Sequence, residues 1–284
     1  MHLMNHTQLD RLPPGLYIVA TPIGNLGDLT PRAADILARA DLLAVEDSRV
    51  TAKLLHHIGV KRPMTPYHDH NADRVRPGLV ARLGSEAIAL VSDAGTPLIS
   101  DPGFKLVRDA RAAGHAVTTL PGPCAAIAAL TLAGLPTNRF FFAGFLPARA
   151  KARDETIDEL ARIKASLIFY ESGARLGATL AALANRLGAR DAAVTREISK
   201  THEECVTGAL PTLAELYADA PPKGEIVLVV APPGEAAAPE EADVDSALLD
   251  AMTRLSPARA ASEVAKATGL PRRDLYARAL TLRP

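Results

Sequence analysis

A loop rich in turn-forming residues, Ser92-Asp93-Ala94-Gly95-Thr96-Pro97, follows five consecutive apolar residues at 87–91. The apolar run is typical of a buried strand, and open α/β sheets bind ligands at the carboxyl ends of their parallel strands. Gly95 would let backbone N–H groups approach a ligand closely, and Asp93 offers a carboxylate to a cationic group. Further on, Asp101-Pro102 has the pattern of a helix N-cap followed by a first helical residue. The stretch therefore predicts either a binding loop or a tight turn between a strand and a helix.

Two more loops of similar composition follow predicted strands. Pro22-Ile23-Gly24-Asn25-Leu26-Gly27-Asp28 comes after the strand at 16–21, and Pro121-Gly122-Pro123-Cys124-Ala125-Ala126 comes after the strand at 116–120. The earlier loop lacks the Gly-x-Gly-x-x-Gly pattern, so a dinucleotide site is not indicated. In the later loop, small side chains would let a ligand lie against backbone, although a hinge between domains would use the same residues. The recurrence of such loops favours a binding site.

Charged side chains gather at other strand ends, where they serve either chemistry or a solvated surface. Glu46-Asp47 follows the strand at 42–45, and His68-Asp69-His70 follows a short strand at 64–67. His-x-His in extended chain resembles half of a metal site, but no third ligand of matching character accompanies it, so we predict no metal. The clusters in the second half of the chain are Glu171-Ser172, Arg196-Glu197 with Lys200, and His202-Glu203-Glu204.

Cations gather in two segments, although the whole chain is balanced at 32 Lys and Arg against 32 Asp and Glu. Arg149, Lys151 and Arg153 lie in a segment without anions that we interpret as a mobile loop suited to phosphates. A second group, at 254–283, includes Arg272 and Arg273. Clustered cations favour an RNA-facing side of the molecule, while a basic tail that docks on a neighbour is the simpler alternative.

The elements that position these residues alternate between strand and helix, which is typical of doubly wound α/β sheets with parallel character. The stretch at 233–245 is rich in Ala, Pro and acidic residues, and two helices beyond it are separated by Leu270-Pro271. The predicted divisions are a flexible N-terminus (1–14), an N-terminal α/β domain (15–121), a C-terminal α/β domain (122–232), a linker (233–245) and a helical module with helix-turn-helix spacing (246–284).

Composition excludes several classes of protein. At 284 residues and 48% hydrophobic, the chain can bury two cores of ordinary domain size. Cys124 and Cys205 lack Cys-x-x-Cys spacing, which argues against a disulfide scaffold or zinc site and fits a reducing cytosol. There is no signal-peptide pattern, and the longest apolar run, at 124–135, is shorter than the roughly 20 residues that span a bilayer. We expect a soluble, cytoplasmic protein.

Several of these strings, taken in order, resemble the tetrapyrrole methylase superfamily, and within it the branch that modifies RNA. They are Thr21 to Asp28, Glu46 to Arg49, His68 to Asn71, Ser92 to Pro97, Leu120 to Ala125, Phe169 to Ser172, Arg196-Glu197 and Lys223 to Glu225. The resemblance covers about 16–230, and the basic tail resembles the C-terminal helical module of the same proteins. Tetrapyrrole-modifying members carry Gly-x-Gly-Pro-Gly where this chain has Thr-Pro-Ile-Gly-Asn, which favours an RNA substrate.

The resemblance implies two α/β domains of the class III methyltransferase type with S-adenosylmethionine (SAM) between them. It also implies a homodimer that methylates the 2′-hydroxyl of a cytidine ribose in the decoding region of 16S rRNA. By the same analogy, the residues expected at the cofactor are Pro22, Gly24, Asp93, Ala94, Gly95, Leu98, Cys124, Ala125 and Tyr170.

Methyl transfer to a ribose hydroxyl needs alignment in a nearly dry cleft and a base or cation beside the hydroxyl, because that hydroxyl is a poor nucleophile at neutral pH. Glu171, Glu197 and Lys200 are the candidates for this catalytic role. The residues expected to contact the RNA substrate are Glu46, Asp47, His68, Asp69, Arg149, Lys151, Arg153, Arg196, Arg272 and Arg273.

Two alternatives remain open at this point. A methyltransferase acting on a small tetrapyrrole would have a deep pocket ringed by arginines and no need for the basic tail. A non-catalytic RNA-binding or ribosome-assembly protein would keep the fold and bind a nucleotide without turnover.

Overall fold

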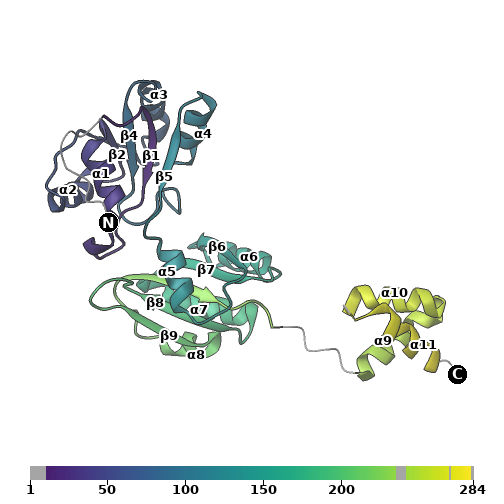
Figure 1. The fold of residues 1–284 in the computed structure, drawn as a ribbon. Helices are drawn as coiled ribbons and strands as arrows, with labels where there is room; N and C mark the ends of the chain where they lie inside the picture. Colours follow the sequence, from purple (N-terminus) through teal and green to yellow (C-terminus); the bar gives the residue numbers. More distant parts are fainter. Residues whose placement is uncertain (1–10, 235–240, 269, 283–284) are drawn as a thin grey trace, which may run out of the picture. The chain divides into compact units, whose positions relative to one another are not determined.

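The computed structural model describes residues 11–234, 241–268 and 270–282, without the side chains of 241–243 (Figure 1). Residues 1–10 of the predicted flexible N-terminus and 235–240 of the predicted linker lie outside the described residues. The chain separates into two compact units, Met1–Pro232 and Pro233–Pro284. Among the described helices, none is long and apolar enough to cross a membrane.

A five-stranded parallel sheet organises the first lobe of the larger unit, at 15–120. Its strands are β1 (Gly15–Val19), β2 (Leu42–Val45), β3 (Met64–Pro66), β4 (Ala87–Val91) and β5 (Val117–Leu120). They lie in the order β3-β2-β4-β1-β5, and every neighbouring pair is parallel. The parallel arrangement confirms the prediction for this half and brings the carboxyl ends of all five strands to one edge of the sheet.

Helices cover both faces of this sheet, which explains why its strands are continuous apolar runs. On one face α1 (Pro31–Arg39) and α2 (Ser48–His57) pack Leu37, Leu54 and Leu55 against it. On the other, α3 (Ala72–Arg82) and α4 (Phe104–Ala112) contribute Leu79 and Leu106. A short 3₁₀ helix, η1 (Leu26–Asp28), lies in the loop after β1.

The start of α4 corrects the prediction that Asp101-Pro102 caps and opens that helix. α4 begins at Phe104, and its N-cap is Gly103, with φ of 140° and no side-chain cap. Leu98 and Ser100 before it have φ of 75° and 65°, a left-handed conformation that costs a non-glycine residue about 1–2 kcal/mol. Such strained residues cluster at functional sites, and here they precede a carboxylate that is free of the capping role.

The second lobe, at 125–230, has a mixed sheet. Its strands are β6 (Phe140–Phe145), β7 (Ser166–Ser172), β8 (Asp191–Arg196), β9 (Glu204–Ala209) and β10 (Glu225–Val230), in the order β6-β7-β10-β8-β9. Only β6 and β7 are parallel to each other. The pairs β7–β10, β10–β8 and β8–β9 are antiparallel. The edge strand β9 was not predicted, because its half-exposed residues do not form an apolar run.

Four helices complete the second lobe. α5 (Ala125–Leu132) packs on one face of the sheet, and α6 (Ala150–Leu160), α7 (Gly173–Leu187) and α8 (Leu210–Leu216) pack on the other. The predicted mobile basic loop is wrong for Lys151 and Arg153, since both lie in α6. Alanines alternate with charged helix formers there, and Lys151 lies 3.8 Å from Glu155 one turn on.

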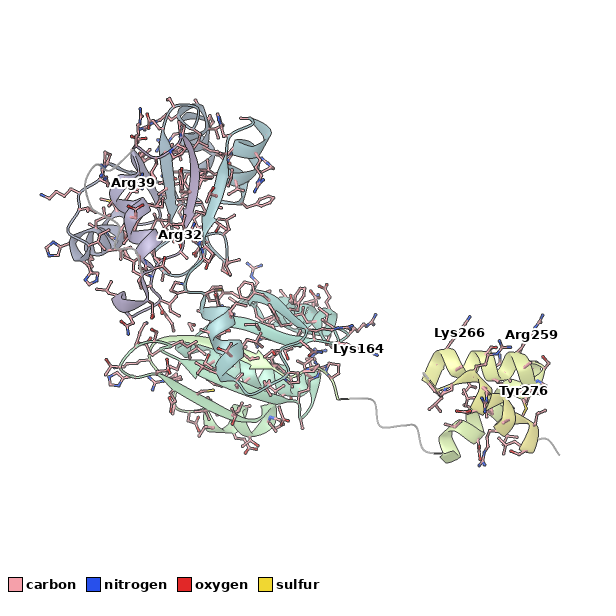
Figure 2. All side chains as sticks on the ribbon, in the orientation of Figure 1. Arg32, Arg39, Lys164, Arg259, Lys266 and Tyr276 are labelled. Atoms are coloured by element: carbon pink, nitrogen blue, oxygen red, sulfur yellow. The ribbon has the colours of Figure 1, made fainter. Side chains whose placement is uncertain are left out.

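The smaller unit consists of α9 (Glu241–Arg254), α10 (Pro257–Thr268) and α11 (Arg272–Thr281) around a core that includes Leu248, Val264 and Leu275. α9 shows that the predicted linker ends too late, because Val244 and Leu248 supply a helical apolar stripe within an acid-rich stretch. Figure 2 labels Arg259 and Lys266 on α10, where both side chains are exposed.

Candidate active site

The three predicted binding loops meet at the carboxyl edge of the first sheet. Thr21 and Gly95 exchange two backbone hydrogen bonds, of 2.9 and 3.1 Å, and the Thr96 hydroxyl donates to the Pro123 carbonyl at 2.9 Å. Gly95 has φ of 76°, and a Cβ there would lie 3.3 Å from the Ile23 side chain. The loops after β1, β4 and β5 are therefore fastened to one another.

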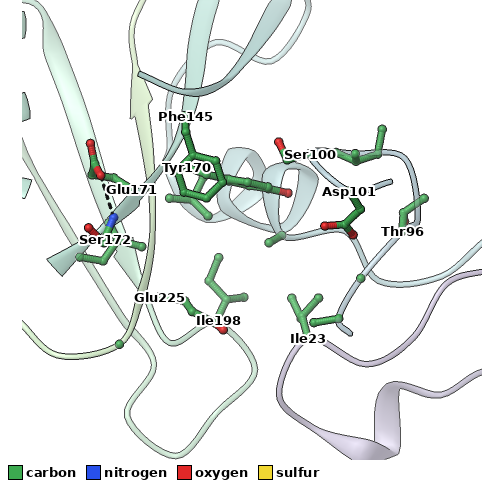
Figure 3. A pocket seen from close by; sticks show the side chains of 17 residues that line it. Ile23, Thr96, Ser100, Asp101, Phe145, Tyr170, Glu171, Ser172, Ile198 and Glu225 are labelled. Carbon is green, nitrogen blue, oxygen red and sulfur yellow. Dashed lines mark hydrogen bonds between the residues drawn. The ribbon is translucent and has the colours of Figure 1, made fainter. Parts of the chain in front are cut away.

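A pocket of about 370 Å³ lies beside these loops and is lined by both lobes of the larger unit (Figure 3). Its size is within the range of small-molecule sites. The first lobe contributes Ile23, Ala94, Gly95, Thr96 and residues 99–101, and the second contributes Ala125, Phe145, residues 170–172, Ile198 and residues 224–227.

The structure places four of the nine predicted cofactor residues in the lining: Ala94, Gly95, Ala125 and Tyr170. Four others do not line the pocket, but each is directly adjacent in sequence to a residue that does. They are Pro22, Asp93, Leu98 and Cys124. Gly24 lines a second hollow together with residues 25, 26 and 199–201.

Tyr170 points into the pocket from β7 (Figure 3). Its ring contacts those of Phe142 and Phe145 edge-on, with centroids 4.9 and 5.6 Å away. Burial raises the pKa of its hydroxyl, which forms hydrogen bonds with Cys124 and the backbone of Ala126. Tyr170 is thus an uncharged aromatic side chain that lines the pocket and connects the second sheet to the start of α5 through its hydrogen bonds.

Asp101 is a pocket residue that the sequence reasoning missed, because Asp-Pro before a helix has the pattern of a cap. Burial, followed by the neighbouring charge of Glu46, raises the pKa of Asp101 to about 6. Glu46 and Asp93 also have raised pKa values, chiefly through burial. Asp93 accepts a hydrogen bond from the backbone N–H of Asp47 at 3.0 Å, and Glu46 accepts one from that of Asp93 at 3.4 Å. The first lobe therefore presents a partly buried, negatively charged group of side chains around the pocket.

The carboxylate of Glu171, a predicted catalytic residue, is engaged by groups of its own lobe. Its side chain is only 1% exposed and accepts hydrogen bonds from the Thr179 hydroxyl at 2.7 Å and the Ser172 N–H at 2.9 Å. Arg175 lies 3.3 Å from the same carboxylate. The carboxylate is thus occupied at the start of α7 and is not available to a ligand in the pocket.

Glu197 and Lys200, the other predicted catalytic residues, belong to one ion-pair network. Lys200 Nζ lies 2.9 Å from Glu197 Oε1 and 2.9 Å from Glu225 Oε2. The backbone N–H of Glu225 donates to Glu197, and this bond, with that from Lys200, lowers the pKa of Glu197. A carboxylate with a lowered pKa is a weak base, so this arrangement does not favour Glu197 as a proton acceptor.

The loop that carries Lys200 also connects the two lobes. The hydrocarbon chain of Lys200 packs over Gly24, where a Cβ would lie 2.3 Å from Lys200 Cγ. The Ser199 hydroxyl donates a hydrogen bond to the Asp28 carboxylate. The loop between β8 and β9 therefore holds the loop after β1.

The predicted RNA-contacting residues of the first lobe lie around the same sheet edge. Asp47 caps α2 and is bound by Arg49, whose hydrogen bonds lower the pKa of Asp47 to about 2. His68 is half-buried and contacts His70 with ring centroids 5.9 Å apart, while Asp69 is exposed. Within the described residues, no group of three His, Cys, Asp or Glu side chains could hold a metal ion.

The predicted cationic contacts are dispersed. Arg149 and Lys151 are exposed at the start of α6, whereas Arg153 is half-buried. Arg196 pairs with Glu204 at 2.9 Å. Arg272 and Arg273 are exposed on the first turn of α11, in the smaller unit.

Comparisons with known proteins define the class. The family model described as Tetrapyrrole (Corrin/Porphyrin) Methylases matches residues 15–214, and the one described as RsmI C-terminal HTH domain matches residues 238–283. This chain belongs to the tetrapyrrole methylase family, as its sequence motifs predicted.

Two curated relatives indicate the branch. The chain is 56% identical over 272 residues to the ribosomal RNA small subunit methyltransferase I of Erythrobacter litoralis, covering 96% of each chain. It is 50% identical over 275 residues to the protein of the same name from Mesorhizobium japonicum, covering 96% of this chain and 93% of that one.

A solved structure of uroporphyrin-III C-methyl transferase from Thermus thermophilus, complexed with S-adenosyl homocysteine, has the same fold. Its TM-score is 0.53 at 21% identity, with 76% of this chain and 97% of that chain covered.

Proposed function

We propose that this protein is a SAM-dependent methyltransferase that 2′-O-methylates a cytidine in the decoding region of 16S rRNA. The observation that carries the proposal is the pocket formed by the three fastened loops and the second sheet, in a chain 56% identical to a ribosomal RNA small subunit methyltransferase I. The 2′-hydroxyl and the decoding region follow from the sequence resemblance.

The residues around the pocket fit SAM. Ala94, Gly95 and Ala125 are small, so a ligand can lie against their backbone, and Ile23 and Ile198 offer apolar walls to an adenosine. SAM carries a positive sulfonium and ammonium, and the residues that line the pocket include three carboxylates, those of Asp101, Glu171 and Glu225. Demethylated product, S-adenosylhomocysteine (SAH), is the ligand named with the Thermus structure of the same fold.

RNA is a better acceptor than a small tetrapyrrole for this site. Among the described residues that line the pocket there is no arginine or lysine, whereas a tetrapyrrole with several carboxylates calls for cations. The exposed cations of the smaller unit, Arg259, Lys266, Arg272 and Arg273, suit a phosphate backbone instead.

The chain's own contribution to the reaction is alignment and exclusion of water. The fastened loops hold the small lining residues rigidly, and rigid placement lowers the barrier to an in-line displacement by holding the reacting groups in line. Bound SAM supplies an electrophilic methyl group. The half-buried side chains of Tyr170, Ile23 and Ile198 limit the access of water to that region, and a drier site strengthens the electrostatic effect of nearby charges.

The proposal extends to the assembly and location of the protein. We infer that the protein is a cytoplasmic homodimer. The sequence resemblance supports the dimer, and the cysteine usage supports the cytoplasm. Phe140 and Phe141 on the edge strand β6 are 46% and 42% exposed, and an apolar edge of this kind is suited to contact with a second chain.

The test is transfer of a labelled methyl group from SAM to 30S particles reconstituted with unmodified 16S rRNA. We expect label in 16S rRNA, released on nuclease digestion as 2′-O-methylcytidine, and resistance of the adjoining phosphodiester to alkali. Particles of the large subunit and uroporphyrinogen III are the controls. Label in uroporphyrinogen III, or on a base rather than a ribose, would contradict the proposal.

A further inference from the structure

The carboxylates that line the pocket differ in how many hydrogen bonds and ion pairs they already make with other groups of the protein. Glu171 is bound by Thr179 and Ser172, and Glu225 lies 2.9 Å from Lys200. Asp101 is different. The strongest influences on its charge are burial, the carboxyls of Glu46, Asp93 and Asp69, and a hydrogen bond with the Ser92 hydroxyl. Asp101 is therefore the lining carboxylate left to act on a ligand.

Figure 3 shows the Asp101 carboxylate and the Tyr170 hydroxyl pointing toward each other across the pocket, from the first and second lobes. The strained backbone at Leu98 and Ser100 immediately precedes Asp101, and Gly103 follows it. Gly103 packs tightly, since a Cβ there would lie 2.8 Å from the Leu90 side chain. The loop is thus held in a shape that presents this carboxylate to the cavity.

We propose that Asp101 is the general base of the methyl transfer and accepts the proton of the acceptor ribose hydroxyl. In this step the hydroxyl oxygen forms a bond to the methyl carbon of SAM as its proton passes to the Asp101 carboxylate. The carbon–sulfur bond breaks, and its electron pair remains on sulfur to give neutral SAH. Asp101 later releases the proton to water. The inference rests on the proposed function and names the residue that the function requires.

The electrostatic surroundings suit this role. Burial, followed by the carboxyls of Glu46 after β2, Asp93 after β4 and Asp69 after β3, raises the pKa of Asp101 to about 6. At neutral pH the Asp101 carboxyl is therefore ionised, and it is a stronger base than an exposed aspartate. A proton acceptor needs both properties, because it must be unprotonated before the reaction and must still bind the proton during it. Tyr170 stays neutral beside it, because burial raises the pKa of its hydroxyl.

The same negative group could instead bind the positive charge of SAM, and the experiment separates the two roles. Asp101→Asn removes the base and keeps the shape. Asp101→Glu keeps a carboxylate. Asp35→Asn is the matched control, since Asp35 lies on α1 away from the pocket, where it pairs with Arg39. Each protein is assayed for methyl transfer to reconstituted 30S particles between pH 5.5 and 8.5, and for binding of SAM and SAH by calorimetry.

We expect Asp101→Asn to lower kcat by about 10²- to 10⁴-fold, the usual contribution of a general base, with unchanged affinity for both SAM and SAH. The wild-type rate should rise with pH through an apparent pKa of about 6, and this limb should disappear in the variant. Asp101→Glu should restore part of the rate and the limb, and Asp35→Asn should match wild type.

Three results would overturn the inference. A normal rate in Asp101→Asn excludes a base at this position. Loss of affinity for SAM alone shows that Asp101 holds the sulfonium, and loss of affinity for both SAM and SAH shows that it holds another part of the cofactor; either result assigns it to cofactor binding. If Asp101→Glu still binds SAH but recovers neither the methyl-transfer rate nor its rise with pH, Asp101 has only a structural role. If the wild-type protein itself labels no rRNA, the proposed function fails as well. The wild-type assay alone distinguishes this outcome from a failure of the inference about Asp101.

Discussion

Carboxyl groups near strand ends differ in this protein, and the difference is decided by the partners that the fold brings to each one. Glu171 lies at the end of β7, and Thr179, eight residues on in α7, donates a hydrogen bond to its carboxylate. Asp101 has the local pattern of a cap and lies in the pocket instead. Local sequence shows which residues end an element, but which side chains then contact a carboxylate depends on how the elements fold against one another.

At this scale we predict that Asp101→Asn stabilises the protein at alkaline pH. A raised pKa means that the folded state holds a proton more tightly than the unfolded state, so Asp101 favours folding at low pH and this contribution is lost as the pH rises from about 4 to about 6. Asparagine removes the burial of a charge. We expect a gain of about 1–2 kcal/mol at pH 8, less than the whole shift at about 1.36 kcal/mol per pKa unit, because the group is partly solvated.

Urea denaturation of both proteins at pH 8 and pH 4.5 measures this effect. The gain should shrink at the lower pH, where wild-type Asp101 is protonated in the folded state. An equal difference at the two pH values would show that the substitution acts through packing and not through the charge.

Between elements, α7 packs closely against the segment before β10. A Cβ on Gly173, the first residue of α7, would lie 1.6 Å from the Pro222 carbonyl oxygen. Two backbone segments are in contact there, and Gly224 and Glu225, which line the pocket, follow Pro222 within three residues along the chain. This contact connects the packing of the helix to the shape of the site.

We predict that Gly173→Ala lowers the free energy of unfolding by about 1–3 kcal/mol, the usual cost of overpacking, and weakens binding of SAH. Gly78→Ala is the control. Gly78 lies inside α3 with nothing within 4 Å of a built Cβ, so alanine there should stabilise by about 0.5–1 kcal/mol. Urea denaturation and calorimetry supply both measurements. Equal stability of the two variants would argue against the tight contact.

Elements were predictable where burial leaves a clear pattern. The apolar runs predicted as strands at 42–45 and 87–91 are strands in which every residue is buried. Pairing direction was not predictable in the second lobe. Periodicity reports burial, whereas the antiparallel neighbours of β10 are fixed by how loops return, which has no local signal.

At the scale of the whole molecule, the smaller unit has a core of its own and presents cations outward. Arg272 and Arg273 lie exposed at the start of α11, whereas Arg254 is engaged by Asp250 at 3.3 Å and Glu263 at 3.2 Å. The two arginines on α11 are therefore the better candidates for binding phosphates.

We predict that replacing Arg272 and Arg273 by alanine weakens binding to 30S particles. The slope of log affinity against log salt concentration should become shallower by about one for each phosphate that the variant no longer neutralises. Arg254→Ala should have a smaller effect, because its charge is already neutralised within the unit. Filter binding at several salt concentrations measures both. Identical salt slopes for all three proteins would show that α11 does not contact the RNA backbone, and SAH binding should remain unchanged throughout.

The position of β10 has a consequence for synthesis. It is the last strand of the larger unit to leave the ribosome, yet it lies at the centre of the second sheet, between β7 and β8. Until residue 230 is available, those two strands have open edges that no other described strand fills, and a nascent chain can complete neither the sheet nor the pocket wall at 224–227. The enzyme therefore becomes able to hold its methyl donor only when nearly the whole of this unit has been made.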